Sequence, residues 1–233
     1  MSSHLDPIES LFRDSFVVLP QFLDGRERAQ LRRAGDAALT WSRAQCTETS
    51  HTTPRISLLT QGTSFEGGTA ALAPILAFAG GARVCALLGA VARGASAQAL
   101  ELKDAHYYHE QTKRDWDGDW HRDSQFSSAD PALERELIAR SCSVHVRVAF
   151  EDDDRLEVVP ASHTRWDTDE ELRIRRGGNR ATDQMPNAMR VVLKAGDACV
   201  FHAWSIHRAT YRRTPIRRTL DLLYAATRAL KPQ

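Results

Sequence analysis

The residues of this chain whose types and spacing suit a transition metal begin with His121 and Asp123, in the segment Trp120-His121-Arg122-Asp123. The segment is expected to be extended, and side chains two positions apart on a strand point to the same face. An imidazole and a carboxylate side by side supply two of the three protein ligands of a facial Fe(II) site. The third ligand must come from a distant part of the chain, and the best candidate is His207.

An arginine ten positions after His207 suggests a co-substrate. A guanidinium binds a carboxylate through two parallel hydrogen bonds, which a lysine cannot reproduce. Arg217 is expected to open the last strand, where it could hold the distal carboxylate of 2-oxoglutarate while the keto-acid end chelates iron. His-X-Asp alone is a weak signal, because a chain with nine histidines always offers a later one. The hypothesis therefore depends on the ordered combination of all four residues.

The elements that must position these residues change in character along the chain. Residues 1–95 are expected to be largely helical, with an amphipathic helix from Gly25 to Trp41 that begins after an Asp24 cap. Residues 96–233 instead offer eight short extended runs separated by turn residues, which predicts a barrel or a double-sheet jelly roll. The runs are 99–112, 120–126, 142–150, 156–159, 190–193, 198–202, 206–211 and 217–224. Length favours a single domain spanning residues 1–233.

Two segments interrupt the predicted strands. Residues 131–140 are expected to form a helical insert. Residues 161–189 are long, polar and carry Gly177-Gly178. A loop of this length in a compact domain is usually functional, so we expect a lid over the site.

Composition limits the partners of the protein. Lys and Arg number 31 against 30 Asp and Glu, so net charge gives no attraction to nucleic acid or to an anionic membrane. No apolar run has the length of a membrane span, and residues 1–6 lack the pattern of a secretory signal. The four cysteines are scattered, as in a reduced cytoplasmic protein. We expect a cytoplasmic protein with a small-molecule substrate, and leave open whether it forms a homodimer.

Several segments in combination resemble the phytanoyl-CoA dioxygenase family. The resemblance covers roughly residues 101–224 and rests on Trp120-His121-Arg122-Asp123, Leu156-Glu157-Val158-Val159-Pro160-Ala161-Ser162-His163, Ala195-Gly196-Asp197-Ala198-Cys199-Val200-Phe201, His207 and Arg217-Arg218-Thr219-Leu220. The resemblance implies a mainly β protein with α elements, in which N-terminal helices support a cupin-like double-stranded β-helix. It also implies an enzyme that depends on Fe(II), 2-oxoglutarate and O2.

The resemblance assigns roles to individual residues. It implies that His121, Asp123 and His207 bind the catalytic iron. It implies that Arg217 rather than Arg218 grips 2-oxoglutarate, because a small residue follows two places later, and that Gln111 is a polar position that helps bind it. The sequence departs from the family at three places: Arg208-Ala209 after the distal histidine, Ala161 in place of glycine, and 110–114 in place of a Lys-Pro-Pro-Gly-like turn.

The expected activity is oxidation of a C–H bond of a natural-product intermediate or an amino acid. Hydroxylation is favoured, although desaturation, ring formation and epimerisation share the same kind of iron site. Related halogenases have a small residue where this chain has Asp123, so the carboxylate argues against halogenation. The alternative is a non-catalytic cupin-like protein that binds a metal or ligand without turnover.

Two groups of polar residues on predicted strands are each compatible with two interpretations. Tyr107 and His109 would share a strand face with Gln111 and could touch substrate, although packing of the sheet explains them as well. His145 and Arg147 alternate with valines, and alternation alone does not say whether their face meets solvent or the barrel interior.

Overall fold

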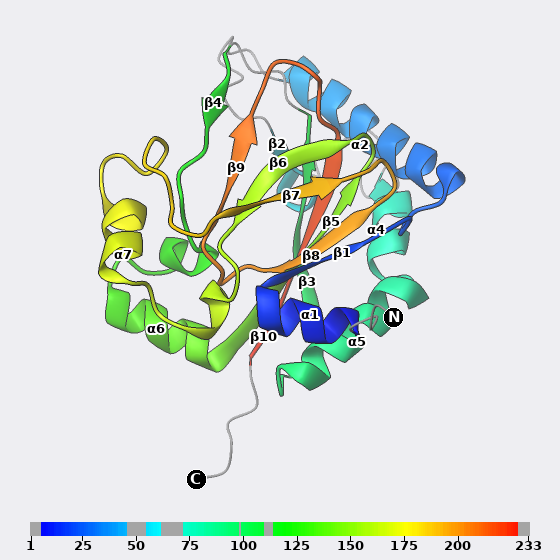
Figure 1. Ribbon diagram of the computed structural model, residues 1–233. Helices are drawn as coiled ribbons and strands as arrows, with labels where there is room; N and C mark the ends of the chain where they lie inside the picture. Colours follow the sequence, from blue (N-terminus) through cyan, green and yellow to red (C-terminus); the bar gives the residue numbers. More distant parts are fainter. Residues whose placement is uncertain (1–5, 46–54, 62–71, 98, 110–113, 228–233) are drawn as a thin grey trace, which may run out of the picture.

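Two antiparallel sheets make up the core of the computed structural model, which describes residues 6–45, 55–61, 72–97, 99–109 and 114–227 (Figure 1). The six-stranded sheet has the order β1-β8-β5-β10-β3-β2, and the four-stranded sheet has the order β4-β9-β6-β7. The two sheets, with helices packed against them, confirm the predicted jelly roll. Its strands are β1 (Phe16–Leu19), β2 (Arg55–Ser57), β3 (Glu101–Tyr108), β4 (Trp116–Asp117), β5 (Ser141–Ala149), β6 (Asp153–Val158), β7 (Met189–Leu193), β8 (Ala198–His202), β9 (His207–Tyr211) and β10 (Thr219–Thr227).

Helices flank the sheets on two sides, with α2, α4 and α5 along one side of the strands and α7 on the other (Figure 1). The helix at residues 25–41 forms as predicted, and its cap is real: Asp24 Oδ1 accepts from the backbone N–H of Glu27 at 2.8 Å. The helical elements are α1 (Pro7–Asp14), α2 (Gly25–Gln45), α3 (Leu58–Gln61), α4 (Ala73–Ala79), α5 (Ala82–Gly94), η3 (Asp123–Phe126), α6 (Pro131–Arg140), η4 (Ser162–Thr164) and α7 (Asp169–Arg176).

Side-chain alternation on the central strands separates an apolar face from a polar one. On β5, Val144, Val146 and Val148 pack into the main hydrophobic core, together with residues of α2, α4 and α5. On β10, Leu220 and Leu222 do the same. The intervening side chains of both strands therefore point into the space between the two sheets.

The structure corrects three expectations about individual segments. Residues 120–126 do not form a strand: His121 makes only an isolated bridge with His207, and Asp123 begins the 3-10 helix η3. Residues 161–189 are not an open loop, because they contain η4 and α7. Arg217 does not open the last strand, which starts two residues later.

Among the described residues, no single helix is long and apolar enough to cross a membrane. The bent pair of α4 and α5 satisfies the length and composition criteria when its two helices are taken together.

Candidate metal centre

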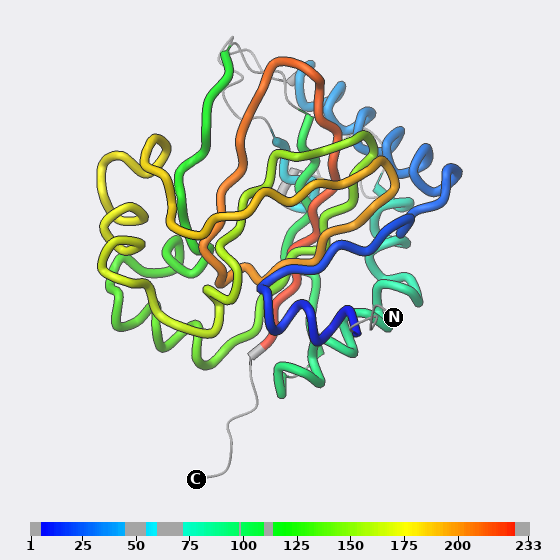
Figure 2. Tube along the Cα trace, viewed as in Figure 1, coloured from blue at the N-terminus to red at the C-terminus, as the bar shows by residue number. Residues whose placement is uncertain are grey.

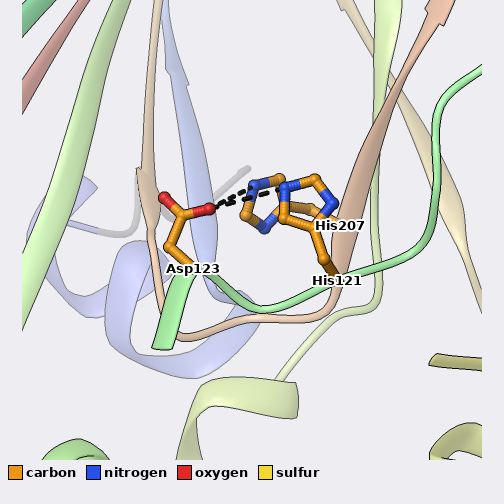
Figure 3. A group of neighbouring side chains, drawn as sticks. All are labelled: His121, Asp123 and His207. Atoms are coloured by element: carbon orange, nitrogen blue, oxygen red, sulfur yellow. Dashed lines mark ion pairs between the residues drawn. The ribbon is translucent and has the colours of Figure 1, made fainter. Parts of the chain in front are cut away.

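His121, Asp123 and His207 converge at one end of the space between the sheets (Figure 3). Each offers one ligand atom, and these atoms all lie within 4.8 Å of one another. Asp123 Oδ1 is the shared neighbour: it lies 3.4 Å from His121 Nε2 and 3.6 Å from His207 Nε2. Two imidazole nitrogens and one carboxylate oxygen on one side of an open space form the facial donor set of mononuclear Fe(II) sites.

Backbone contacts bring the two distant parts of the chain together. The N–H of His121 donates to the carbonyl of His207 at 3.0 Å, and the N–H of His207 returns a bond to His121 at 2.9 Å. The N–H of Asp123 donates to the carbonyl of Ala203 at 3.0 Å, so the turn into η3 aims its carboxylate back at the histidines. The expected strand geometry was wrong here, but the side chains still meet.

The two histidine rings are held with Nε2 toward the centre. Nδ1 of His121 lies 2.7 Å from the carbonyl of Asp119, and Nδ1 of His207 lies 3.0 Å from the carbonyl of Ser205. A carbonyl only accepts, so Nδ1 carries the proton and the Nε2 lone pair is available to a metal.

A series of hydrogen-bonded side chains with alternating charge supports the carboxylate of Asp123 on its side away from His121 and His207. His145 Nε2 lies 2.8 Å from Asp123 Oδ2, and His145 Nδ1 lies 2.7 Å from Asp221 Oδ1. Asp221 Oδ2 in turn accepts from Arg147 Nη2 at 2.6 Å. The polar face of β5 therefore points into the interior, which answers the question that its alternation left open.

Asp221 is the residue that sequence analysis missed. It is a carboxylate on a strand whose neighbours Leu220 and Leu222 are core residues, and a lone charge in such a strand was the available signal. The register places it directly opposite Arg147.

Protonation states in the cluster suit a metal. Burial and the nearby His121 lower the pKa of His207 to about 3, so this imidazole is neutral at physiological pH. Burial alone would raise the pKa of Asp123, but hydrogen bonds from His121 and His145 hold it well below its ordinary value. Burial would lower the pKa of His145, but Asp221 and Asp123 together raise it to about 10. A neutral histidine and an ionised carboxylate are the forms that coordinate.

A cavity of about 1250 Å³ adjoins the cluster. His121, Asp123 and His207 line it, and Ala181 and Thr182 border it from the predicted lid segment. Its walls also carry His106 and Tyr108, whereas Tyr107 lies in the core with its hydroxyl donating to Asp36 at 2.6 Å. The suggestion that Tyr107 contacts substrate is therefore wrong, and the packing interpretation holds.

The structure describes one of the two residues predicted to bind 2-oxoglutarate. Arg217 is 1% exposed, and its Cζ atom lies 4.7 Å from the ring centre of Tyr108 and 5.4 Å from that of Tyr211. Both tyrosines line the cavity. Arg218 instead pairs with Asp36. Gln111 lies outside the described residues.

Arg122, which lies between His121 and Asp123 in the sequence, links these two candidate ligands to the predicted lid segment, residues 161–189. The guanidinium of Arg122 is completely buried and pairs with Asp167 at 2.7 Å. Asp167 also pairs with Arg175 of α7 at 2.5 Å, and Arg175 pairs with Glu134 of α6 at 3.0 Å, all with side chains 0% exposed. The ligand loop is therefore fixed to both α6 and α7.

The fold and the cluster define a double-stranded β-helix protein with a 2-His-1-carboxylate centre. The chain belongs to the phytanoyl-CoA dioxygenase (PhyH) family, whose model matches residues 13–220. No curated protein matches the chain in sequence.

Solved structures of similar fold include three of particular interest. AviO1 from Streptomyces viridochromogenes Tue57 has a TM-score of 0.67 at 17% identity, over 99% of each chain. The non-heme alpha ketoglutarate dependent epimerase SnoN from nogalamycin biosynthesis has a TM-score of 0.63 at 19% identity, over 96% of this chain and 84% of SnoN. EctD from S. alaskensis with bound Fe has a TM-score of 0.65 at 19% identity, over 96% of this chain and 76% of EctD.

Proposed function

We propose that the protein is an Fe(II)- and 2-oxoglutarate-dependent oxygenase that uses O2 to oxidise a C–H bond of a small molecule. The observation that carries the proposal is the convergence of His121 Nε2, His207 Nε2 and Asp123 Oδ1 beside a cavity. Membership of the PhyH family supports the reaction class.

The residues present fit an iron ion. Fe(II) suits two imidazoles and one carboxylate, which occupy one face and leave the other positions for ligands. Both imidazoles are oriented through Nδ1, and the carboxylate is ionised and held by His145. Support of this kind around each ligand is usual in functional metal sites.

The co-substrate has a candidate partner in Arg217. We propose that its guanidinium binds the distal carboxylate of 2-oxoglutarate, since it is buried against two tyrosines of the cavity wall. Gln111 remains a proposed second contact. EctD with 2-oxoglutarate and 5-hydroxyectoine, and EvdO2 complexed with 2-oxoglutarate, share the fold of this chain.

When bound, iron and 2-oxoglutarate supply the oxidising power for C–H cleavage, and the protein supplies binding and orientation. His121, His207 and Asp123 fix where the reacting centre lies. His145 holds the second oxygen of Asp123, and Asp221 holds the other ring nitrogen of His145, so that the carboxylate keeps one orientation.

The substrate proposed is a natural-product intermediate or an amino acid. The cavity volume of about 1250 Å³ exceeds what a small co-substrate fills, which favours the larger of these molecules. Hydroxylation is the expected outcome, and the similarity to the epimerase SnoN keeps epimerisation as the alternative. A cytoplasmic location remains a prediction from the sequence, and whether the chain forms a homodimer stays open.

Release of succinate from 2-oxoglutarate tests the proposal. The purified protein with Fe(II) and O2 should release succinate, and His207→Ala should not. The double variant His121→Ala, Asp123→Ala should lose iron binding, and iron binding unchanged in this variant would overturn the assigned ligands. Stoichiometric iron without any absorbance change on anaerobic addition of 2-oxoglutarate would favour the cupin-like binding protein instead.

A matched pair of arginines tests the co-substrate site. Arg217→Gln should weaken 2-oxoglutarate binding by about tenfold or more, because it removes a charge-assisted pair. Arg218→Gln, which alters the neighbouring side chain that pairs with Asp36, should leave binding close to that of the wild type. Equal losses in both variants would contradict the assignment of Arg217.

A further inference from the structure

We propose that Arg208 is a positioning residue that fixes one wall of the substrate cavity, and that a metal bound by His121 and His207 tightens this wall. The inference deepens the proposed function and rests on it, because the wall borders the space in which a substrate would meet the iron. Arg208 belongs to one of the three places at which the sequence departs from the family, so the device is a feature of this chain.

Ala181 and Thr182 form a wall of the cavity that adjoins the metal centre. Both belong to the predicted lid segment, and they follow α7 in a stretch of turns that contains neither helix nor strand. Backbone carbonyls in such a stretch need hydrogen-bond partners from outside regular secondary structure. The position of this wall is therefore decided by its contacts with neighbouring segments.

Three carbonyls in and beside the wall accept hydrogen bonds from two residues of other segments. The carbonyl of Ala181 accepts from Arg208 Nη1 at 2.8 Å. The carbonyls of Arg180 and Asp183 accept from Trp120, the first from its backbone N–H and the second from its indole N–H, both at 3.1 Å. The wall is therefore held on both sides of Ala181 by Trp120, and Arg208 supplies the bond at its centre.

The two donor residues are packed against each other. The Cζ atom of Arg208 lies 4.4 Å from the ring centre of Trp120, which is a cation–π contact. Its Nε atom donates to a carboxylate oxygen of Glu157 at 2.6 Å, a charge-assisted hydrogen bond. Trp120 is 1% exposed and the side chain of Arg208 is 11% exposed, so both side chains are restricted. The guanidinium therefore keeps its Nη1 atom on the carbonyl of Ala181.

The same two residues are sequence neighbours of the candidate metal ligands. Trp120 precedes His121, Arg208 follows His207, and the backbone N–H groups of the two histidines donate to each other's carbonyls at 3.0 and 2.9 Å. A metal bound to both imidazoles would join these two segments a second time and restrict the motion of the residues next to each histidine. The metal should therefore reduce opening of the wall, and the closed wall should in turn favour metal binding, because such coupling is reciprocal.

Amide hydrogen exchange, followed by mass spectrometry under anaerobic conditions, tests the proposal on metal-free and on Fe(II)-loaded protein. In the wild type, Fe(II) should slow exchange in peptides that cover residues 178–185 by about fivefold or more. Arg208→Met keeps an apolar stem against Trp120 but removes the hydrogen bond to Ala181. In this variant the same peptides should exchange faster without metal, and Fe(II) should slow them by less than about twofold.

Two further variants separate this role from a general loss of stability. Arg212→Gln breaks a pair with Asp117 at 2.7 Å that ties the end of β9 to β4, and should respond to Fe(II) as the wild type does. Trp120→Phe keeps a ring against Arg208 but loses the indole N–H, so it should show a smaller effect of the same sign. It remains informative if Arg208→Met does not fold. Exchange in β5, residues 141–149, reports whether the fold of each variant is intact.

The outcomes distinguish the inference from the proposed function. Wild-type protein that binds Fe(II) without slower exchange at residues 178–185 would overturn the coupling. A folded Arg208→Met protein with the wild-type response, or an equal loss of response in Arg212→Gln, would overturn the role of Arg208. Failure of the wild type to bind Fe(II), measured as metal content, would instead overturn the proposed function.

Discussion

His145 Nε2 lies 2.8 Å from Asp123 Oδ2, the carboxylate oxygen that does not face His121 and His207. The histidine therefore fixes the orientation of a metal ligand without being one of the three converging residues. Its other nitrogen is held by Asp221. The effect of this contact on metal affinity can be measured directly.

His145→Ala should weaken Fe(II) binding by roughly 10–100-fold, the usual effect of removing a group that orients a metal ligand. Competition with a chromophoric chelator under anaerobic conditions gives the dissociation constant. His106→Ala is the control, because His106 also lines the cavity but bonds to Asp104 rather than to the ligands. The same iron affinity in His145→Ala and in the wild type would contradict an orienting role.

The buried ion pairs of Arg175 with Asp167 and Glu134 should contribute more to the free energy of unfolding than an exposed ion pair on the same helix. Arg175→Met leaves Asp167 and Glu134 each short of a partner in a fully buried setting, and should lower the free energy of unfolding by about 3 kcal/mol or more. Arg173→Met on the same helix breaks a pair with Asp183 whose arginine is 62% exposed, and should cost less than about 1 kcal/mol. Urea unfolding compares the two, and similar costs would refute the distinction.

Ionised Glu171 should make the free energy of unfolding depend on pH. Burial would raise the pKa of this carboxyl, but Arg165 and the Thr168 cap lower it below 4.5. A depressed carboxyl pKa stabilises the fold above the unfolded pKa, and this contribution is lost as pH falls through the folded pKa. Glu171→Gln should thus cost about 1.5–3 kcal/mol at pH 7 and progressively less toward pH 3.

Glu170→Gln is the matched control for this experiment, since it makes the same charge change at an exposed position on the same helix. Unfolding titrations at several pH values give both curves. The two variants should differ most at neutral pH and converge in acid, and a constant difference between them would argue against an ionised Glu171 at neutral pH.

Gly118 allows the cavity rim to approach β9. A Cβ atom at this position would lie 2.6 Å from the carbonyl oxygen of Ala209, and backbone cannot rotate away as a side chain can. Gly118→Ala should cost about 1–3 kcal/mol, which lowers the melting temperature by several degrees. Gly178→Ala has nothing within 4 Å of the added carbon and should leave the melting temperature nearly unchanged. Scanning calorimetry distinguishes the two, and equal shifts would mean that the close contact is unimportant.

Most strands of the C-terminal part were predictable from sequence because alternation of apolar and polar residues is a local property, although residues 120–126 do not form the predicted strand. The run at 198–202 and the insert at 131–140 match β8 and α6. Alternation could not say which face of β5 is interior, since this depends on what packs against each face. The helices of the N-terminal part cover the valine face, and this leaves His145 and Arg147 inside.

The meeting of His121, Asp123 and His207 was predictable by residue type, but not by local geometry. Asp123 reaches the histidines through a 3-10 turn held by the carbonyl of Ala203, a tertiary contact that no strand pattern contains. Asp221 was missed for a similar reason, since its role depends on the register between β10 and β5. The role of Arg217 is still a prediction.

The position of β10 between β5 and β3 has a consequence for biosynthesis (Figure 2). Proteins emerge from the ribosome with the N-terminal end first. Among the strands that the structure describes, the one that supplies Asp221 comes last in the sequence, and it joins β5 to β3 in the six-stranded sheet. His121, Asp123 and His207 are all synthesised before the scaffold that holds their support exists. We therefore expect stable metal binding to require that β10 has been synthesised and has paired with β5, because only then does Asp221 hold His145 against Asp123.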